Sequence, residues 1–254
     1  MKNILLTIFV LGCLVSTQVY AANSDNISLT TGFEYSTGKY GSTTDTSIFT
    51  VPVIARYKSG LWIFRLTVPY VRVSGTGGVL SNGIRINSPA TSKSTTRSGL
   101  GDVVAAATYS VSSAYQGNLG VDLTGKLKLG TADTSLGTGQ NDFAVQADLY
   151  RHFDRFTPKA ALGYEVMGSP RDVSMNNVMY AIVGGAYKIA EHTHVGSELW
   201  LSEKPSAAAA EQAELAVYLN YKVHNDMNIR GYVLQGFSDG SPDSGIGVLV
   251  SSGF

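Results

Sequence analysis

Histidine and serine are the residue types from which a catalytic or metal site in this chain would be built. An acyl-transfer site needs a serine and a histidine within hydrogen-bond reach, and a metal site needs several ligands at short spacing. The sequence has no His-Glu-x-x-His motif. Its scattered histidines are His152, His192, His194 and His224. We therefore expect no enzyme activity, no metal and no cofactor.

Charged residues recur at every second position inside apolar segments, and this spacing is the clearest functional pattern in the sequence. Residues 118–129 show it best, because Asp122, Lys126 and Lys128 alternate with leucine and valine. Successive side chains of a β-strand point to opposite faces, so such a segment has one polar and one apolar side. Charges of both signs on one side could select a permeating molecule, or they could pair with one another and fill the space.

The same period of two recurs in twelve segments along the chain. A wall between lipid and a polar lumen requires it, whereas no stretch after Val15 is long and apolar enough for a transmembrane helix. The segments lie near residues 27–35, 49–57, 62–70, 103–109, 118–129, 143–149, 160–166, 178–189, 193–202, 215–221, 227–237 and 244–254. We predict an all-β fold, a transmembrane antiparallel β-barrel of about 12 strands in an up-and-down meander. The facing of residues 178–189, 193–202, 227–237 and 244–254 is the least regular.

The connections between these segments alternate in length, as they do in bacterial outer-membrane barrels, where turns are short on the periplasmic side and longer outside. The short set is residues 58–60, 112–117, 154–156, 190–192 and 224–226. The longer set is residues 37–45, 73–98, 130–140, 168–175, 203–212 and 238–243. An even number of strands then places both ends of the mature chain in the periplasm.

Aromatic residues gather at both ends of the predicted strands, as the two lipid boundaries of a barrel require. The periplasmic set is Tyr57, Trp62, Tyr109, Tyr187, Tyr221 and Phe254, and the external set is Tyr35, Phe49, Tyr70, Phe143, Tyr164 and Phe237. A secreted β-sandwich would also alternate, but it should not keep outward aromatics at both strand ends. The last strand, ending on Phe254, resembles the signal by which the barrel assembly machinery recognises its clients.

The first 21 residues read as a cleaved signal peptide, which leaves residues 22–254 as the barrel. Lys2 is followed by a short apolar run and by Val19-Tyr20-Ala21, a small-residue cleavage site. Removing Lys2 leaves 18 basic against 19 acidic residues, a formal charge of −1, which argues against a nucleic-acid partner. Cys13, the only cysteine, lies in this segment. We expect the mature protein in the bacterial outer membrane, in contact with the lipid bilayer.

Twelve strands about 4.8 Å apart and tilted by roughly 40° would enclose a lumen about 24 Å across between backbones, half of it filled by side chains. The residues expected to line it are Glu34, Arg56, Arg65, Asp102, Asp122, Lys126, Lys128, Asp142, Gln146, Asp148, Lys159, Glu165, Lys222 and Arg230, together with Tyr150, Glu214, Tyr218 and Asn228. Six of them should share one stretch of wall on neighbouring strands: Asp102, Asp122, Lys126, Asp142, Asp148 and Lys159. No aromatic-lined inner face is evident in the sequence.

Pro52 and Pro69 fall in neighbouring predicted strands near the outer rim, and proline cannot donate to a β-ladder. We expect a weakened or bulged hairpin there, either a structural irregularity or a lateral opening to lipid. Residues 73–98 form the longest predicted connection, either a lid that folds into the lumen or a solvated loop. Asp102 follows a glycine turn and is expected to cap the start of its strand.

The stretch Ser98-Gly99-Leu100-Gly101-Asp102, leading to Tyr109, resembles a signature of the outer-membrane family named for the MetA-pathway of phenol degradation. Val68-Pro69-Tyr70 and Leu136-Gly137-Thr138-Gly139 add to this similarity, which would cover most of residues 27–254. The resemblance implies a channel or transporter for passive passage of small molecules, including aromatic or apolar compounds. A plugged structural or adhesion barrel that acts through its external loops is the alternative, and a lipid-hydrolysing barrel is a rival that the histidine positions disfavour.

Overall fold

The computed structural model of the chain describes residues 27–75, 78–80, 84–86, 95–112, 119–133, 135–171, 173–207 and 209–254. The expected signal peptide, residues 1–21, lies outside the described residues. The strands are β1 (Ile27–Gly38), β2 (Thr46–Ser59), β3 (Trp62–Gly75), β4 (Gly78–Leu80), β5 (Ile84–Ile86), β6 (Thr95–Leu100), β7 (Val103–Ser112), β8 (Leu119–Leu129), β9 (Asp142–Arg151), β10 (Phe156–Val166), β11 (Val178–Ala190), β12 (Thr193–Ser202), β13 (Gln212–Lys222), β14 (Met227–Gly236) and β15 (Ser244–Gly253). No helix in the described part of the chain could cross a membrane.

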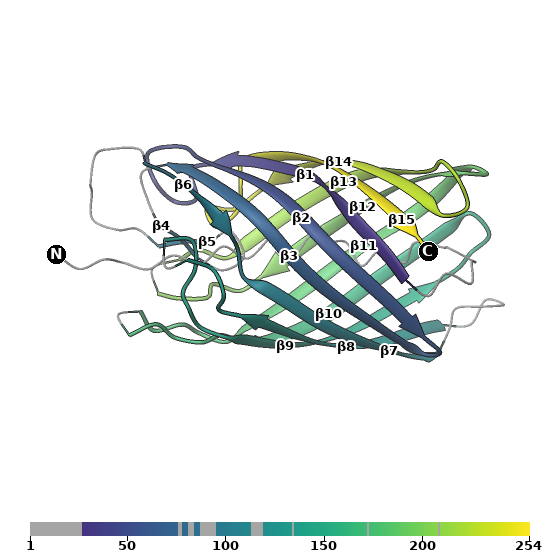
Figure 1. Cartoon of the computed structure of the whole chain (residues 1–254), viewed down its shortest axis with the longest axis horizontal. Coiled ribbons are helices and arrows are strands. Elements are labelled where there is room, and N and C mark those ends of the chain that lie inside the picture. The colour runs from purple at the N-terminus through teal and green to yellow at the C-terminus, as the bar shows by residue number, and fades with distance from the viewer. Residues whose placement is uncertain are drawn as a thin grey trace.

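The strands close into one antiparallel barrel in which each strand pairs with its neighbours in the sequence (Figure 1). β6 pairs with the external half of β3, and β7 pairs with the periplasmic half of the same strand. β6 and β7 therefore occupy together one of the twelve strand positions around the barrel. β1 pairs with β15 from Ser28 opposite Gly253 to Thr37 opposite Ser244. The predicted twelve-stranded meander and its closure are therefore confirmed. β4 and β5 form a separate two-stranded sheet.

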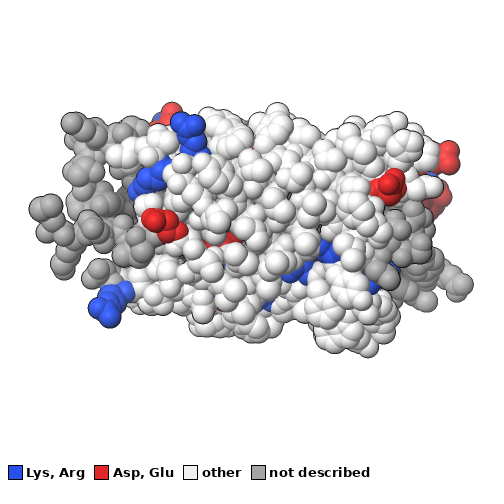
Figure 2. Space-filling model, viewed as in Figure 1, with Lys and Arg blue, Asp and Glu red and all other residues white. Residues whose placement is uncertain are grey.

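Side chains alternate between the outside of the barrel and its interior as the sequence predicts. In β1, for example, Phe33 and Tyr35 are exposed while Glu34 and Ser36 are buried. Every residue of the two predicted aromatic girdles is exposed except Tyr109, which is half-buried. The face in Figure 2 is mostly uncharged, and its charged side chains lie mainly toward the two ends. Such a surface is suited to a lipid bilayer, which leaves the polar residues for the lumen.

The external rim between β3 and β7 differs from the sequence-based expectation. The long connection predicted at residues 73–98 is shorter, because β3 continues to Gly75 and pairs with β6 from Thr95 onward. Val71 and Val73 explain the extension, since both are fully buried inside this end of the barrel. Residues 76–77, 81–83 and 87–94 of this connection lie outside the described residues.

The two prolines do not bulge the hairpin in which they lie. Pro52 stands directly opposite Pro69 in a β2–β3 ladder of unbroken register, so the predicted bulged hairpin is wrong. The bulge lies on the other side of β3. Between the pairs Tyr70–Leu100 and Thr67–Val104 the β6–β7 strand has one residue more than β3, and the Gly101 N–H donates to the Pro69 carbonyl at 2.8 Å. An extra residue on one strand breaks the ladder and increases the local twist.

A lateral opening to lipid between β2 and β3, at Pro52 and Pro69, stays a prediction, and amide hydrogen exchange tests it. An opening requires the amides of β2 and β3 beside the two prolines to exchange faster than those at the same height in β9 and β10, where the ladder is regular. Full protection of β2 and β3 would exclude a lateral opening there.

Tyrosines and glycines on the inner wall are paired across neighbouring strands. Each of four inward tyrosines lies over an inward glycine, and a Cβ atom on that glycine would come within 3.0 Å of the tyrosine ring. The pairs are Tyr150 over Gly120, Tyr180 over Gly163, Tyr218 over Gly196 and Tyr232 over Gly247. The rings therefore lie flat against the wall instead of crossing the lumen.

Candidate functional site: the interior of the barrel

The external end of the interior is covered by side chains from the loops, which we call the external cap. Tyr40 from the β1–β2 connection and Leu136 from the β8–β9 connection pack with Val71 and Val73 of β3, and all four are buried. A second apolar cluster lies on the other side, with Met167 and Met175 from the β10–β11 connection. The loops therefore carry apolar residues into the mouth, where they exclude water from the rim of the barrel.

A buried ionic triad ties the external cap to the wall. The ammonium group of Lys128 lies 2.6 Å from the Asp142 carboxylate and 3.4 Å from that of Asp102. Each carboxylate also accepts a backbone hydrogen bond from a loop, Asp102 from the Ala132 N–H at 2.9 Å and Asp142 from the Gly168 N–H at 2.8 Å. Asp102 thus holds a neighbouring loop, and its predicted role as a cap of its own strand is wrong.

Below the triad, polar side chains of β8 and β9 meet aromatic side chains of β11 and β12 in what we call the waist. The Lys126 ammonium donates to Gln146 Oε1 at 2.7 Å, and the Tyr180 hydroxyl donates to the same oxygen at 3.0 Å. Gln146 in turn donates through Nε2 to Asp148 at 2.8 Å. The Tyr180 ring stacks on Trp200 with the centroids 4.7 Å apart and 15° between the planes. Tyr180 and Trp200 are 3% and 7% exposed, so this part of the lumen is narrow.

The inner wall carries more aromatic surface than the sequence suggests. Tyr180 and Trp200 are joined by Tyr218, Tyr232 and Leu234, which form a buried cluster on β13 and β14. The expectation that no inner face is lined by aromatic residues is therefore wrong. The expectation failed because the alternation in β11, β12 and β14 is irregular, which left the facing of Tyr180, Trp200 and Tyr232 undecided.

The predicted lumen residues all occupy the inward positions of their strands or of the adjoining turn. Ten are buried, namely Glu34, Asp102, Asp122, Lys128, Asp142, Gln146, Glu165, Glu214, Tyr218 and Arg230. Eight are half-buried, namely Arg56, Arg65, Lys126, Asp148, Tyr150, Lys159, Lys222 and Asn228.

The predicted stretch of six charges is divided by height. Asp102 and Asp142 join Lys128 near the external end, whereas Asp122 lies directly opposite Asp148 across the β8–β9 ladder lower down. Lys159 instead pairs with Glu198, a residue that sequence reasoning missed.

Glu198 reaches Lys159 across an intervening strand because of a glycine. Gly184 lies between them, paired with Lys159 on one side and with Glu198 on the other. A Cβ atom at Gly184 would come within 3.0 Å of the Glu198 side chain, so no larger residue fits beneath the ion pair. The signal for this ion pair in the sequence is Glu198 itself, a charged residue two positions before Trp200. The facing of that segment, residues 193–202, was not fixed by the alternation.

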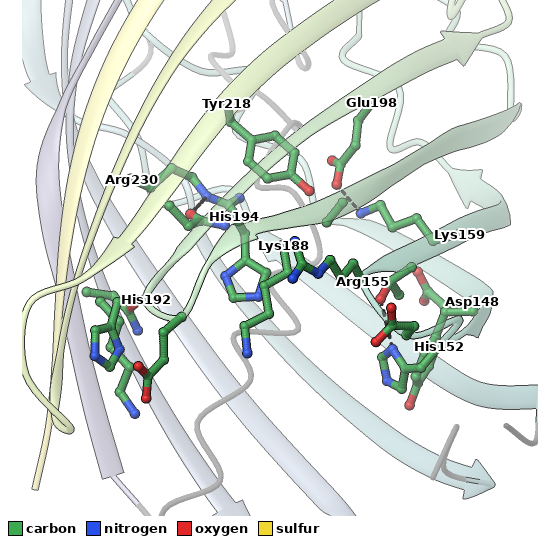
Figure 3. A pocket seen from close by; sticks show the side chains of 18 of the residues that line it. Asp148, His152, Arg155, Lys159, Lys188, His192, His194, Glu198, Tyr218 and Arg230 are labelled. Atoms are coloured by element: carbon green, nitrogen blue, oxygen red, sulfur yellow. Dashed lines mark hydrogen bonds and ion pairs between the residues drawn. The ribbon is translucent and has the colours of Figure 1, made fainter. Parts of the chain in front are cut away.

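The periplasmic half of the interior opens into a cavity of about 560 Å³, which we call the vestibule (Figure 3). Tyr218 and Glu198 lie at its inner end, and Lys188, His194 and Arg155 lie toward its mouth (Figure 3). Its volume is in the range of pockets that bind small molecules. The described interior thus runs from a covered external end, through a narrow waist, to an open periplasmic cavity.

Three histidines, His152, His192 and His194, line the mouth of the vestibule. His152 shares a 2.9 Å hydrogen bond between its Nδ1 and the Thr157 hydroxyl. Burial lowers the pKa of the His152 imidazole, which favours the neutral ring at the periplasmic pH. Among the described residues, no group of three or more His, Cys, Asp or Glu is arranged to hold a metal ion.

Comparison with known protein families shows to which family the chain belongs. Residues 24–251 match the model of a family described as "Putative MetA-pathway of phenol degradation". The chain belongs to this family. No curated protein matches the sequence.

Solved structures share the fold at low sequence identity. The crystal structure of the COG4313 outer membrane channel from Pseudomonas putida F1 is similar over 94% of this chain and 100% of its own, with a TM-score of 0.71 and 14% identity. The NanC porin is similar over 90% and 100%, with a TM-score of 0.59 and 10% identity. The KdgM porin is similar over 89% and 99%, with a TM-score of 0.52 and 11% identity. This member of the family is accordingly a β-barrel of the bacterial outer membrane.

Proposed function

We propose that this barrel is a passive channel for small molecules that have an aromatic or apolar part. The observation that carries the proposal is the division of the interior into two walls. Tyr180, Trp200, Tyr218 and Tyr232 form an aromatic side on β11–β14, while Lys126, Gln146 and Asp148 form a polar side on β8 and β9. A small molecule with both kinds of surface could contact both sides as it passes.

The size of the waist supports a small permeant. Open diffusion channels leave an aqueous pore and need about sixteen strands, whereas a barrel of twelve strands fills much of its lumen with side chains. Here the waist is packed by the hydrogen-bonded chain from Lys126 to Asp148 and by the stacked Tyr180 and Trp200. Sugars and peptides of ordinary size are therefore expected to pass slowly or not at all.

Solute uptake by proteoliposomes tests the channel. We expect liposomes that contain the folded barrel to admit benzyl alcohol and phenol faster than protein-free liposomes with the same lipids, and to exclude sucrose. The background leak of such solutes through lipid is fast, so uptake is read by stopped-flow, with heat-unfolded protein as the control. Uptake equal to that control for every solute would contradict the proposal.

The alternative is a plugged barrel that acts in structure or adhesion through its external loops. The external cap favours it, because Tyr40, Leu136 and the Asp102–Lys128–Asp142 triad close the outer mouth. A plugged barrel would give no solute uptake in any condition. We favour the channel because the vestibule continues from the waist to the periplasmic mouth, and an inert plug has no use for such a cavity.

Three further assignments from the sequence belong to this proposal. Residues 1–21 are a signal peptide, so the mature protein should begin at residue 22 or 23, which N-terminal sequencing checks. The last strand, which pairs with both β1 and β14 and precedes the exposed Phe254, is the segment that the barrel assembly machinery recognises. The barrel is not an enzyme, since His152, His192, His194 and His224 all lie at the periplasmic end, away from the outer lipid boundary.

A further inference from the structure

Arg230 is a buried cation on the wall of the vestibule, and its surroundings hold it in one orientation. The residue is 8% exposed. Nε donates to the Asn220 side-chain oxygen at 2.6 Å, and the guanidinium lies 4.4 Å from the centre of the Tyr218 ring. Asn220 stands directly opposite Arg230 in the β13–β14 ladder. These contacts leave the two terminal Nη groups available, and their N–H groups can donate two parallel hydrogen bonds to one carboxylate.

No carboxylate in the described part of the chain completes an ion pair with Arg230. The ion pairs seen on the inner wall include those of Lys128 with Asp102 and Asp142, and that of Lys159 with Glu198. The negative charge of Glu198, on β12, attracts Arg230, but the Glu198 carboxylate already pairs with Lys159. A buried charge is costly unless it is paired, so the Arg230 guanidinium is set up for an anion that comes from outside the chain.

Further cations stand between Arg230 and the periplasm. Lys222 lines the vestibule on β13, and Lys188 lines it on β11 directly opposite His194, with Arg155 at the adjoining turn (Figure 3). Asp148, Asp154 and Glu191 also line the cavity, so it carries both signs. The cations Lys188 and Lys222 lie on the same side of the cavity as Arg230, on strands β11–β14. An anion entering along that side meets Lys222 or Lys188 first and Arg230 last.

We propose that the vestibule binds a small organic carboxylate, with its carboxylate on the Arg230 guanidinium and its apolar body against Tyr218, Ala186 and Tyr150. This inference rests on the proposed channel and names the class of molecule that the channel carries. The end of a guanidinium offers two parallel donors, which match the two oxygens of one carboxylate. A phosphate dianion is normally held by several cations or a nest of backbone N–H groups, and this wall offers a single buried guanidinium. The cavity of about 560 Å³ leaves room for the organic part.

Equilibrium binding to the whole folded barrel in detergent tests the site. The probes are benzoate, benzyl alcohol and inorganic phosphate, measured by calorimetry at pH 7 and low salt, because screening weakens such an interaction. We expect benzoate to bind more tightly than either other probe. Arg230→Gln should weaken benzoate binding about tenfold or more, the loss expected for one charge-assisted hydrogen bond, and Arg230→Lys should weaken it less. Lys204→Gln, which removes the same charge from an exposed external loop, should leave binding unchanged.

Two results would overturn the inference. One is equal binding of benzoate and benzyl alcohol. The other is benzoate binding that Arg230→Gln does not alter. Phosphate binding as tight as that of benzoate would overturn the assignment to organic acids. Should Arg230→Gln fail to fold, judged by heat-modifiable migration in gels, Lys222→Gln on the same wall replaces it and should weaken benzoate binding severalfold.

The binding and uptake experiments distinguish a failure of the carboxylate site from a failure of the channel. A barrel that admits phenol into liposomes but binds benzoate and benzyl alcohol alike keeps the channel and loses the carboxylate site. A barrel that binds benzoate through Arg230 but admits no solute keeps the site and loses the channel.

Discussion

Replacing Lys128 with methionine is expected to lower the free energy of unfolding of the barrel by about 3–5 kcal/mol, the usual cost of removing one partner from a buried ion pair. The substitution leaves Asp102 and Asp142 facing each other, both 3% exposed or less, without the cation between them. Urea titration of the barrel refolded into detergent or lipid measures the change. Hydrogen exchange should also show faster exchange at Ala132 and Gly168, whose N–H groups the two carboxylates hold.

Two further variants show whether this loss comes from the buried charges. Lys204→Met removes an exposed lysine from an external loop and should change the stability by less than about 0.5 kcal/mol. The triple variant Asp102→Asn, Lys128→Met, Asp142→Asn removes all three charges and keeps an oxygen for each loop N–H. It should recover most of the lost stability, because a buried triad can often be replaced by neutral residues at little cost. A triple variant as unstable as Lys128→Met would mean that the loss is one of packing.

Replacing Gly163 with valine is expected to destabilise the barrel by about 1–3 kcal/mol, the cost of overpacking a filled interior. Gly163 lies beneath the Tyr180 ring, and even a Cβ atom there would come within 3.0 Å of it. The ring would have to leave its stack with Trp200 and its hydrogen bond to Gln146. Loss of tryptophan fluorescence anisotropy or a shifted emission maximum would report the movement, and urea titration would report the cost.

A matched glycine and a second-site change separate overpacking from a general intolerance of valine. Gly125 is an outward residue of β8 with nothing within 4 Å of its Cβ position, so Gly125→Val should be neutral or stabilising. Tyr180→Ala should relieve the strain of Gly163→Val, so the double variant should be more stable than additive effects predict. Purely additive effects would show that the two side chains do not compete for space.

The sequence predicts the wall of the barrel well because one physical rule governs every strand. Lipid on one side and a polar interior on the other force a period of two, and β8 displays it from Leu119 to Leu129. Strand number, closure and the alternation of turns and loops follow from that rule. The rule gives no register between strands, so the ladder break at Gly101 and the extension of β3 to Gly75 could not be seen in advance.

The interior was harder to predict because glycine carries no hydropathy signal. Gly184 and Gly196 occupy inward positions where a polar residue would have marked the face, and each accommodates a large side chain from the next strand. The facing of β11 and β12 was therefore undecided, and with it the positions of Trp200 and Glu198. The packing of the loops could not be predicted either, because the burial of Tyr40 and Leu136 depends on contacts between segments far apart in the sequence.

Single-channel current across a planar bilayer, compared between the natural barrel and Tyr180→Ala, tests most directly whether the lumen is a path through the waist. Tyr180 is part of the wall at the waist, where its ring stacks on Trp200 and its hydroxyl donates to Gln146, so removing the ring should widen the narrowest part. We predict small discrete currents for the natural barrel and clearly larger ones for the variant. Absence of current in both, or equal currents in both, would contradict the account.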